Sequence, residues 1–221
     1  MRLDFFTLFP AWFDWFVGQR HVQNVVRDGT RIEFFNYRES TPLSAGQVDD
    51  APYGGGAGMV LRVDVVDAAL QAAYADRARP RVVVLAPTGR QFDESLAVEL
   101  AAEPHLTLLC GRYEGFDERI VDHLADDAIS IGRYVLSGGE PAAMVVADAV
   151  LRKLPGALGH PDGAAEESFS AALDGAPEYP HYTRPPNYRG WKVPDVLLSG
   201  DHERVREWRI ERSRRRAASS R

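Results

Sequence analysis

The stretch RVVVLAPTGRQFDESLAVELAAEPHLTLLCGRYEG, residues 81–115, decides the fold. Residues 81–86 and 106–110 are short apolar runs rich in Val and Leu, which are typical of strands buried on both faces of a parallel sheet. The segment between them predicts a helix near 92–102. A strand, a helix and a second strand in this order indicate an α/β domain with a mostly parallel sheet.

The sequence on both sides continues this alternation. Three further strands are predicted at 2–8, 31–37 and 128–131. Four further helices are predicted at 11–27, 62–77, 115–124 and 140–153. The first of these helices would begin after Pro10, because proline is favoured in a first helical turn, and its aromatic residues Trp12, Phe13, Trp15 and Phe16 are expected in the core.

The C-terminal part differs from the rest in its proline content and its lack of periodicity. Seven prolines lie between Pro155 and Pro194 with little periodicity, so this stretch is predicted to be a linker or an extended segment. Residues 201–216 are predicted to be helical, with Asp201 as N-cap. The chain therefore divides into a large α/β domain, a linker and a small helical part.

Composition excludes several classes of protein. Of 221 residues, 45% are hydrophobic and 26% are charged, which excludes a disordered chain. There is no apolar run of roughly 18 residues, so an integral membrane protein is also excluded. Cys110 is the only cysteine, which excludes an internal disulfide and a multi-cysteine zinc site. The expected compartment is the cytoplasm.

The charge is unevenly distributed. The whole chain carries −6, but residues 202–221 hold eight arginines against three glutamates, a net of +5, which leaves −11 for the rest. A basic tail of this kind suits either a polyanion such as nucleic acid or a solvated helix face.

Three predicted strands end in glycine-bearing breaks: Pro87-Thr88-Gly89, Gly111–Gly115 and Ile131–Gly139. Open α/β sheets bind ligands at the carboxyl ends of their strands, and glycine lets backbone approach a ligand closely. A single glycine there usually only makes a turn, but three successive breaks indicate a binding site, and a purine would suit it.

A glycine-rich loop and an acidic pair are further candidates. The loop Asp49–Gly58 lacks the Gly-Lys-Ser/Thr of a phosphate-binding loop, so it is either a lid over a substrate or a long turn. Glu166 and Glu167 lie in the linker after a helix that ends in Arg152. They are either solvated linker residues or the source of a general base, with Arg152 to stabilise developing negative charge. The histidines are scattered, and no catalytic triad or metal-ligand spacing is present.

The motifs taken together resemble the bacterial tRNA (guanine-N1)-methyltransferases of the knotted SPOUT superfamily over nearly the whole chain. The matching stretches are LFP (8–10), VDDAPYGGGAGM (48–59), LAPTGRQFDE (85–94), LLCGRYEGFDERI (108–120), SIGRYVLSGGE (130–140), LPGALGH (154–160), PHYTRP (180–185) and VPDVLLSGDH (193–202). The resemblance implies a SPOUT-type sheet flanked by helices with a C-terminal trefoil knot, plus a small C-terminal helical domain. It also implies transfer of a methyl group from S-adenosylmethionine to N1 of the guanosine directly 3′ of the anticodon in tRNA.

The resemblance also assigns residues to sites. The expected cofactor-binding residues are Leu85, Pro87, Gly111, Tyr113, Glu114, Gly115, Ile131, Gly132, Arg133, Tyr134, Val135, Leu136, Gly138 and Gly139. The expected substrate-side residues are Asp50, Gly54, Gly55, Gly56 and Gly58. The family's catalytic arginine corresponds to Arg152, and its catalytic aspartate corresponds to Glu167, which is a departure from the family pattern.

The implied organisation is an α/β methyltransferase domain at 1–154, a linker at 155–180 and a tRNA-binding helical domain at 181–221. A homodimer that shares its active site between subunits is implied, and so is Mg²⁺ in catalysis, although the sequence shows no dedicated metal cage. Two alternatives are a related SPOUT enzyme with another RNA target and a non-catalytic RNA-binding relative.

Overall fold

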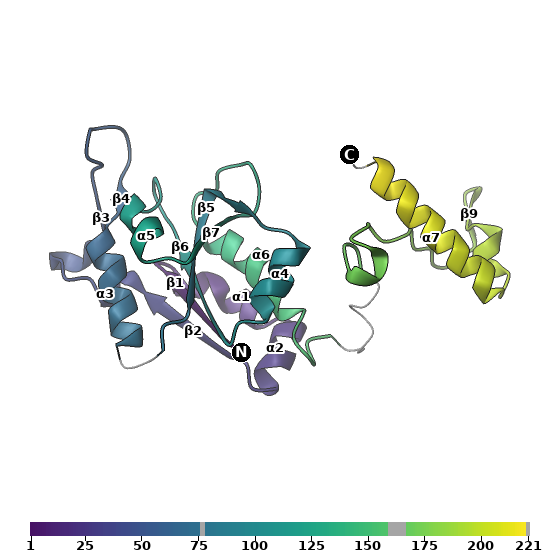
Figure 1. The fold of residues 1–221 in the computed structure, drawn as a ribbon, viewed down its shortest axis with the longest axis horizontal. Helices are drawn as coiled ribbons and strands as arrows, with labels where there is room; N and C mark the ends of the chain where they lie inside the picture. Colours follow the sequence, from purple (N-terminus) through teal and green to yellow (C-terminus); the bar gives the residue numbers. More distant parts are fainter. Residues whose placement is uncertain (76–77, 159–166, 220–221) are drawn as a thin grey trace. The chain divides into compact units, whose positions relative to one another are not determined.

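The computed structural model describes residues 1–75, 78–158 and 167–219. The chain divides into two compact units, Met1–Gly159 and His160–Arg221 (Figure 1). Each unit has its own elements and is described by itself below.

A five-stranded sheet forms the centre of the first unit, in the order β2-β1-β6-β5-β7, and every neighbouring pair is parallel. The strands are β1 (Arg2–Thr7), β2 (Arg31–Asn36), β5 (Arg81–Gln91), β6 (His105–Cys110) and β7 (Asp127–Ser130). The predicted α/β domain with a parallel sheet is confirmed.

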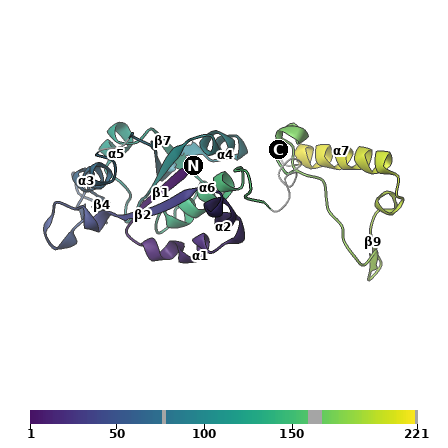
Figure 2. The same cartoon turned by 90° about the horizontal axis from the view of Figure 1, so that it is seen from below.

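Helices cover both faces of this sheet, as Figures 1 and 2 show. One face is packed by α1 (Asp14–Val17), α2 (Arg20–Arg27), α4 (Glu94–Ala101) and α6 (Glu140–Leu151), and the other by α3 (Val63–Tyr74) and α5 (Glu118–His123). Along β5, Val83 and Leu85 enter the first core, whereas Val82 and Val84 enter the second. The run is continuously apolar because successive side chains of a strand point to opposite faces, and both faces are buried here.

The predicted single helix over 11–27 is wrong. The chain forms a 3-10 turn at Pro10–Phe13, then α1, and then α2 after an extended Gln19 with φ −68° and ψ 142°. Phe13 and Phe16 are buried as expected, but Trp12 is 46% exposed and Trp15 is 71% exposed. The break at Gly18-Gln19 turns α2 to a new direction, so the two tryptophans do not share the apolar stripe that one continuous helix would give them.

The predicted end of β5 near Pro87 is also wrong. The strand resumes after an excursion, since both Leu85 and Arg90 pair with Ile129 of β7 and residues 86–89 bulge out of the ladder. Gly89 is required on the return, because a Cβ there would lie 2.5 Å from backbone atoms of Ala128 and Ile129. Pro87 therefore lies on a wide bulge held at both ends, rather than in a free loop.

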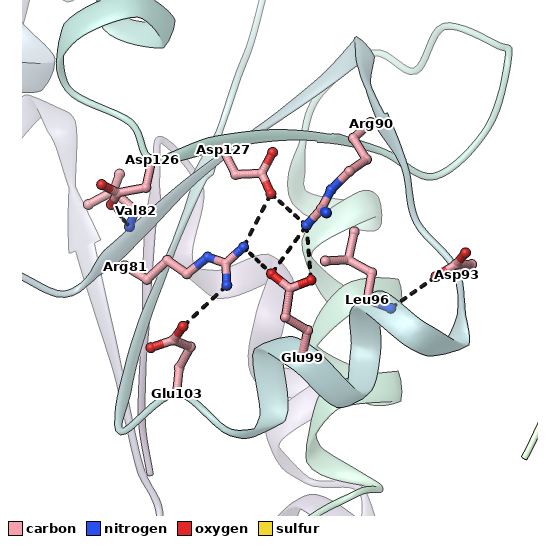
Figure 3. A network of polar contacts seen from close by, with 9 residues as sticks. All are labelled: Arg81, Val82, Arg90, Asp93, Leu96, Glu99, Glu103, Asp126 and Asp127. Atoms are coloured by element: carbon pink, nitrogen blue, oxygen red, sulfur yellow. Dashed lines mark hydrogen bonds and ion pairs between the residues drawn. The ribbon is translucent and has the colours of Figure 1, made fainter. Parts of the chain in front are cut away.

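A charged network holds β5 on both sides of this bulge (Figure 3). Arg81 Nη2 lies 2.6 Å from Glu99 Oε1 and 3.3 Å from Asp127 Oδ2. Arg90 Nη2 lies 2.9 Å from the same Asp127 oxygen. Because Glu99 belongs to α4 and Asp127 to β7, the network ties the start and the return of β5 to two neighbouring elements.

The long segment after β2, predicted to lack periodic structure, contains short ordered pieces. These are 3-10 turns at Tyr37–Glu39 and Ser44–Gly46 and the antiparallel pair β3 (Asp49–Asp50) and β4 (Val60–Leu61). The strands β3 and β4 enclose the glycine-rich loop, which is therefore the tip of a small hairpin.

The second unit is built around α7 (His202–Ser219). Asp201 caps it as predicted, since its Oδ1 accepts a hydrogen bond from the Arg204 N–H at 3.1 Å. The stretch before α7 packs along the helix: Ser213 donates to the carbonyl of Pro177 at 2.8 Å, and the Arg209 guanidinium lies 4.7 Å from the centre of the Tyr179 ring. The unit also contains the antiparallel pair β8 (Asn187–Tyr188) and β9 (Trp191–Lys192) and 3-10 turns at Ala171–Leu173 and Asp195–Leu198. Its described part has no other strand.

Over the residues described, no helix is both long enough and apolar enough to cross a membrane.

Candidate active site

Three chain segments meet around one pocket, one from the middle of β5 and two that follow the carboxyl ends of β6 and β7. They are the bulge of β5, the loop after β6 and the loop between β7 and α6. The lining residues are Leu85, Ala86, Pro87, Gly111, Arg112, Tyr113, Glu114, Gly115, Ile129, Ser130, Ile131, Gly132, Tyr134, Val135, Leu136, Ser137, Gly138, Gly139 and Ala142. The three glycine-bearing breaks seen in the sequence therefore converge on a single cavity.

The second and third of these segments are joined backbone to backbone. Gly139 N–H donates to the carbonyl of Gly111 at 2.8 Å, and Arg112 pairs with Gly138 in an antiparallel bridge. A Cβ on Gly139 would lie 2.7 Å from Gly111 N and 2.8 Å from Cys110 Cα. Only glycine permits this approach, so Gly139 allows the two loops to share one wall of the pocket.

A buried polar pair lies next to this wall. Glu140, the first residue of α6, is fully buried, and its Oε1 accepts a hydrogen bond from the Thr7 hydroxyl at 2.7 Å. Its Oε2 lies 4.0 Å from Arg112 Nη1, and neither atom has a hydrogen-bond partner. Buried polar atoms usually have such partners, so the pair leaves one donor and one acceptor for water or a bound ligand.

Arg112 is further held by aromatic rings. Its guanidinium carbon lies 4.8 Å from the centre of the Phe9 ring and 5.6 Å from that of Trp12. Such cation–π contacts fix the direction of a long side chain. Trp12, which was predicted to lie in the core, is instead half-exposed and contacts the Arg112 guanidinium beside the pocket.

The buried carboxylate also affects its neighbours. Burial raises the pKa of the Cys110 thiol well above its ordinary value, and the negative charge of Glu140 adds to this shift. Burial likewise raises the pKa of the Tyr37 hydroxyl, with Cys110 and Glu140 as further causes. Both groups are therefore neutral at physiological pH and act as packing residues under the pocket.

The glycine-rich hairpin touches the second loop of the pocket. Glu114 N–H donates to the carbonyl of Met59 at 2.9 Å, and Leu61 N–H donates to that of Gly115 at 3.0 Å. A Cβ on Gly58 would lie 2.2 Å from Glu114 Oε1. The Glu114 side chain can therefore pack against this position only because residue 58 has no side chain. The hairpin is thus positioned by the same loop that lines the pocket.

Asp50 lies at the base of this hairpin and lines a second, larger cavity. Its Oδ2 lies 3.0 Å from Arg62 Nη1, and Arg62 also contacts Asp64 at 2.8 Å. The hydrogen bond from Arg62 lowers the pKa of Asp64. The cavity is lined by Asp50, Ala51, Pro52, Tyr53, Val60, Leu61, Arg62, Val63, Asp64, Phe116, Asp117, Glu118 and Arg119. Acidic and basic groups both face it, and Tyr53 at its edge is almost fully exposed.

The expected site residues fall into distinct groups. All of the expected cofactor residues line the first pocket except Arg133, which is exposed on the third loop. Gly54, Gly55 and Gly56 are exposed at the hairpin tip and line neither cavity. Sequence reasoning missed lining residues that flank the glycines, above all Arg112, which lies between the expected residues Gly111 and Tyr113.

The two expected catalytic residues belong to different units. Arg152 is the C-cap of α6, and its N–H donates to the carbonyl of Asp148 at 3.1 Å. Glu167 belongs to the second unit, where its carbonyl accepts a hydrogen bond from Ser170 N–H at 3.1 Å. Glu166 lies outside the described residues.

Across residues 1–75, 78–158 and 167–219, no group of three or more His, Cys, Asp or Glu side chains is arranged to hold a metal ion.

Comparison with known proteins identifies the family. The family model described as tRNA (Guanine-1)-methyltransferase TrmD matches residues 1–221. A tRNA (guanine-N(1)-)-methyltransferase of Brevibacillus brevis is 48% identical over 223 residues, covering 100% of this chain and 90% of that protein. The proteins of the same name from Bacillus subtilis and Listeria welshimeri are 47% and 44% identical, each covering 98% of this chain and 88% of the relative. The chain therefore belongs to the tRNA (guanine-1)-methyltransferase TrmD family.

Proposed function

We propose that this protein transfers a methyl group from S-adenosylmethionine to N1 of a guanosine in tRNA, and that this guanosine lies directly 3′ of the anticodon. Family membership over the whole chain supports the reaction. The observation that carries the proposal is the single pocket formed by three glycine-bearing segments at neighbouring strand ends.

The lining residues fit such a methyl donor. Leu85, Ile131 and Leu136 supply apolar surface for a purine, and the glycine-rich backbone of the second and third loops brings N–H and C=O groups close to its edge. Arg112 Nη1 and Glu140 Oε2 leave an unused donor and acceptor beside the pocket for polar groups of the ligand. When bound, S-adenosylmethionine supplies an electrophilic methyl group.

The protein's own chemical task is to move a proton. N1 of guanine carries a proton at neutral pH and is a poor nucleophile until it loses it. In the proposed mechanism the Glu167 carboxylate would accept that proton, so that N1 could take the methyl group that S-adenosylmethionine would supply. Negative charge develops on O6, where the Arg152 guanidinium stabilises it. General-base catalysis of this kind is typically worth about 10²–10⁴-fold.

Glutamate at position 167 changes the reach of the base. Compared with the aspartate expected from the family, it adds one methylene group and moves the carboxylate by about one bond length. A misplacement of order 1 Å can cost around 10²-fold in rate. Either the linker backbone around Glu167 compensates for the added length, or this protein is slower than its relatives.

The finer architecture belongs to the same proposal. The three pocket segments would form a trefoil knot, and the hydrogen bond between Gly139 and Gly111 supports close threading of the two later loops. Residues 1–154 would be the methyltransferase domain, 155–180 the linker and 181–221 the tRNA-binding domain. Asp50 and the loop Gly54–Gly58 would face the substrate.

The proposed assembly is a homodimer whose active site takes residues from both subunits, acting in the cytoplasm on tRNA. The +5 charge of residues 202–221 supports contact with a polyanion. A Mg²⁺ ion required for catalysis would need mostly water and substrate ligands, because the described residues offer no cage of protein ligands.

Product analysis tests the proposed reaction. The full chain is incubated with a tRNA transcript and S-adenosylmethionine, and the RNA is then digested and analysed by mass spectrometry. The expected product is 1-methylguanosine at the position 3′ of the anticodon, and adenosine at that position should abolish it. A methyl group elsewhere would identify a related enzyme with another RNA target, and tRNA binding without methylation would identify a non-catalytic relative.

A further inference from the structure

A short hairpin in the second unit presents an exposed aromatic pair. Strands β8 and β9 pair Asn187 with Lys192 and Tyr188 with Trp191. Trp191 is 72% exposed and Tyr188 is 51% exposed, and their ring centres lie 5.9 Å apart. The hairpin lies at the end of a loop that extends away from α7 (Figure 2). Large aromatic side chains this exposed do not contribute to a core, so packing does not explain them.

The turn of this hairpin is tightly specified. Arg189 and Gly190 both have positive φ, at 55° and 87°, which is the geometry of a two-residue hairpin turn with the twist that strands prefer. The Asn187 side chain accepts a hydrogen bond from Gly190 N–H at 3.0 Å. Arginine rarely adopts positive φ, so a residue such as Asn would suit the turn itself better.

Arginine at this position has a visible consequence. The Arg189 guanidinium carbon lies 5.2 Å from the centre of the Tyr188 ring. The turn therefore places a positive charge against one aromatic face, with Lys192 on the adjoining strand.

The charge around the hairpin has one sign. Residues 179–194 contain Arg184, Arg189 and Lys192 and not a single Asp or Glu. The same stretch carries three exposed aromatic side chains, Tyr182, Tyr188 and Trp191, whereas Tyr179 is buried. By contrast, α7 interleaves its arginines with Glu203, Glu207 and Glu211. Basic charge combined with exposed aromatic rings is the pattern of surfaces that bind single-stranded nucleic acid, because bases stack on the rings while cations neutralise the backbone.

We propose that the hairpin Asn187–Lys192 is a stacking platform for an unpaired nucleobase of the RNA substrate, with Trp191 as the principal ring. Arg189 and Lys192 neutralise the phosphates next to that base. This inference rests on the proposed function, which makes tRNA the substrate, and it adds a second contact with the RNA besides the reacting guanosine. A base-paired nucleotide does not offer its face to a ring, so the platform selects loop nucleotides.

Affinity measurements on the full chain test the platform. The Kd for a tRNA transcript is expected to rise roughly 5- to 150-fold in Trp191→Ala, the range that corresponds to loss of one base stack. Trp191→Phe, which keeps a π-face, is expected to stay within about threefold of wild type. Leu198→Ala is the matched control, because Leu198 is a 59% exposed apolar side chain of the same unit that cannot stack.

Salt dependence separates stacking from charge. Arg189→Ala is expected to reduce the slope of log Kd against log salt concentration by about 0.7 to 0.9, as loss of one phosphate contact does. Trp191→Ala is expected to weaken binding at every salt concentration without changing that slope. A transcript with an abasic site at the stacked loop position is expected to bind wild type and Trp191→Ala equally.

The outcomes distinguish this inference from the proposed function. If wild type methylates tRNA but Trp191→Ala binds it as tightly as wild type does, the platform is rejected and the enzyme activity stands. An equal loss in Leu198→Ala, or a loss in Trp191→Phe as large as in Trp191→Ala, would also reject stacking. If wild type binds no tRNA at all, the proposed function itself fails.

Discussion

At the scale of single residues, glycines decide whether the pocket can form. Gly139 is the clearest case, because the atoms that a Cβ would meet belong to the backbone of the neighbouring loop and cannot rotate away. The sequence marks this position only as one of several glycines in a strand-end loop. Its necessity appears when residues far apart in the chain are brought together.

Gly139→Ala is expected to lower the free energy of unfolding by about 1–3 kcal/mol, because the methyl group overpacks the junction between two loops. Affinity for S-adenosylmethionine should fall at least tenfold, since the pocket wall has to shift. Urea denaturation and isothermal titration calorimetry measure the two effects. Gly18→Ala is the control: Gly18 has a negative φ of −74°, and its nearest neighbouring atom is 3.4 Å from a Cβ. Equal behaviour of the two variants would contradict the role of Gly139.

Glu167→Gln is expected to cut single-turnover methyl transfer at least tenfold and to leave S-adenosylmethionine binding unchanged, because the amide cannot accept the N1 proton at neutral pH. Glu167→Asp is the matched variant, because it keeps the carboxylate and shortens its reach. Turnover in Glu167→Gln at the wild-type rate would remove Glu167 from the mechanism.

The rate at which a thiol reagent modifies Cys110 measures how tightly the core beneath the pocket is closed. The raised pKa and full burial of Cys110 predict that a thiol reagent modifies it very slowly at neutral pH in the folded protein and rapidly in urea. Bound S-adenosylhomocysteine should slow the reaction further, since the pocket lies directly above. Rapid labelling of the native protein would show that the core beneath the loops is open.

At the scale of elements, the sequence predicts the regular parts of the first unit well. The strands of the sheet and the helices after 60 follow from apolar runs and helical periodicity, because these patterns report burial against a sheet. The predicted end of β5 at Pro87 was wrong. Proline and glycine in the sequence indicate where strand pairing is interrupted, but they do not indicate that the same strand pairs again further along. Resumption depends on Arg90 pairing with Ile129 and contacting Asp127, both distant in sequence.

The hairpin β8–β9 was missed for a related reason. Its strands have two residues each, and Arg-Gly is not a strong turn signal. The candidate pocket was easier to predict, since glycines at three successive strand ends point to the same edge of a parallel sheet. The residues between those glycines, such as Arg112, carry no pattern that indicates which way their side chains point.

The N-cap of α4 gives a pH-dependent prediction. Hydrogen bonds from the Ser95 hydroxyl and the Leu96 N–H lower the pKa of Asp93 below its ordinary value of 3.8 (Figure 3 shows the contact with Leu96). A group with a lowered pKa in the folded state contributes stability above its unfolded pKa, and this contribution disappears as the pH falls through the folded pKa.

Asp93→Asn keeps a capping oxygen but does not titrate. The free energy of unfolding is therefore expected to fall less steeply in Asp93→Asn than in wild type as the pH drops below about 4. Asp93→Ala should also lose about 1 kcal/mol at pH 7, because the cap itself is gone. If the free energy of unfolding falls equally steeply with decreasing pH in wild type and Asp93→Asn, the charge of Asp93 does not contribute to stability.

At the scale of the whole molecule, the two units contain different structural elements. The first unit holds the sheet, the pocket and the glycine-rich hairpin. The second holds the Arg-rich helix and the exposed aromatic hairpin, and six of the chain's fourteen prolines precede the helix in this unit. The composition of the sequence indicates that the chain has two units. The proposed site would combine Glu167 of the second unit with Arg152 of the first.

Hydrogen–deuterium exchange with and without S-adenosylhomocysteine tests the central claim, that three strand-end segments jointly bind the methyl donor. Protection is expected together in residues 85–91, 111–115 and 131–139, with little change in α3 on the other face of the sheet. Protection confined to one of these segments, or centred instead on the cavity beside Asp50, would contradict a shared three-segment site.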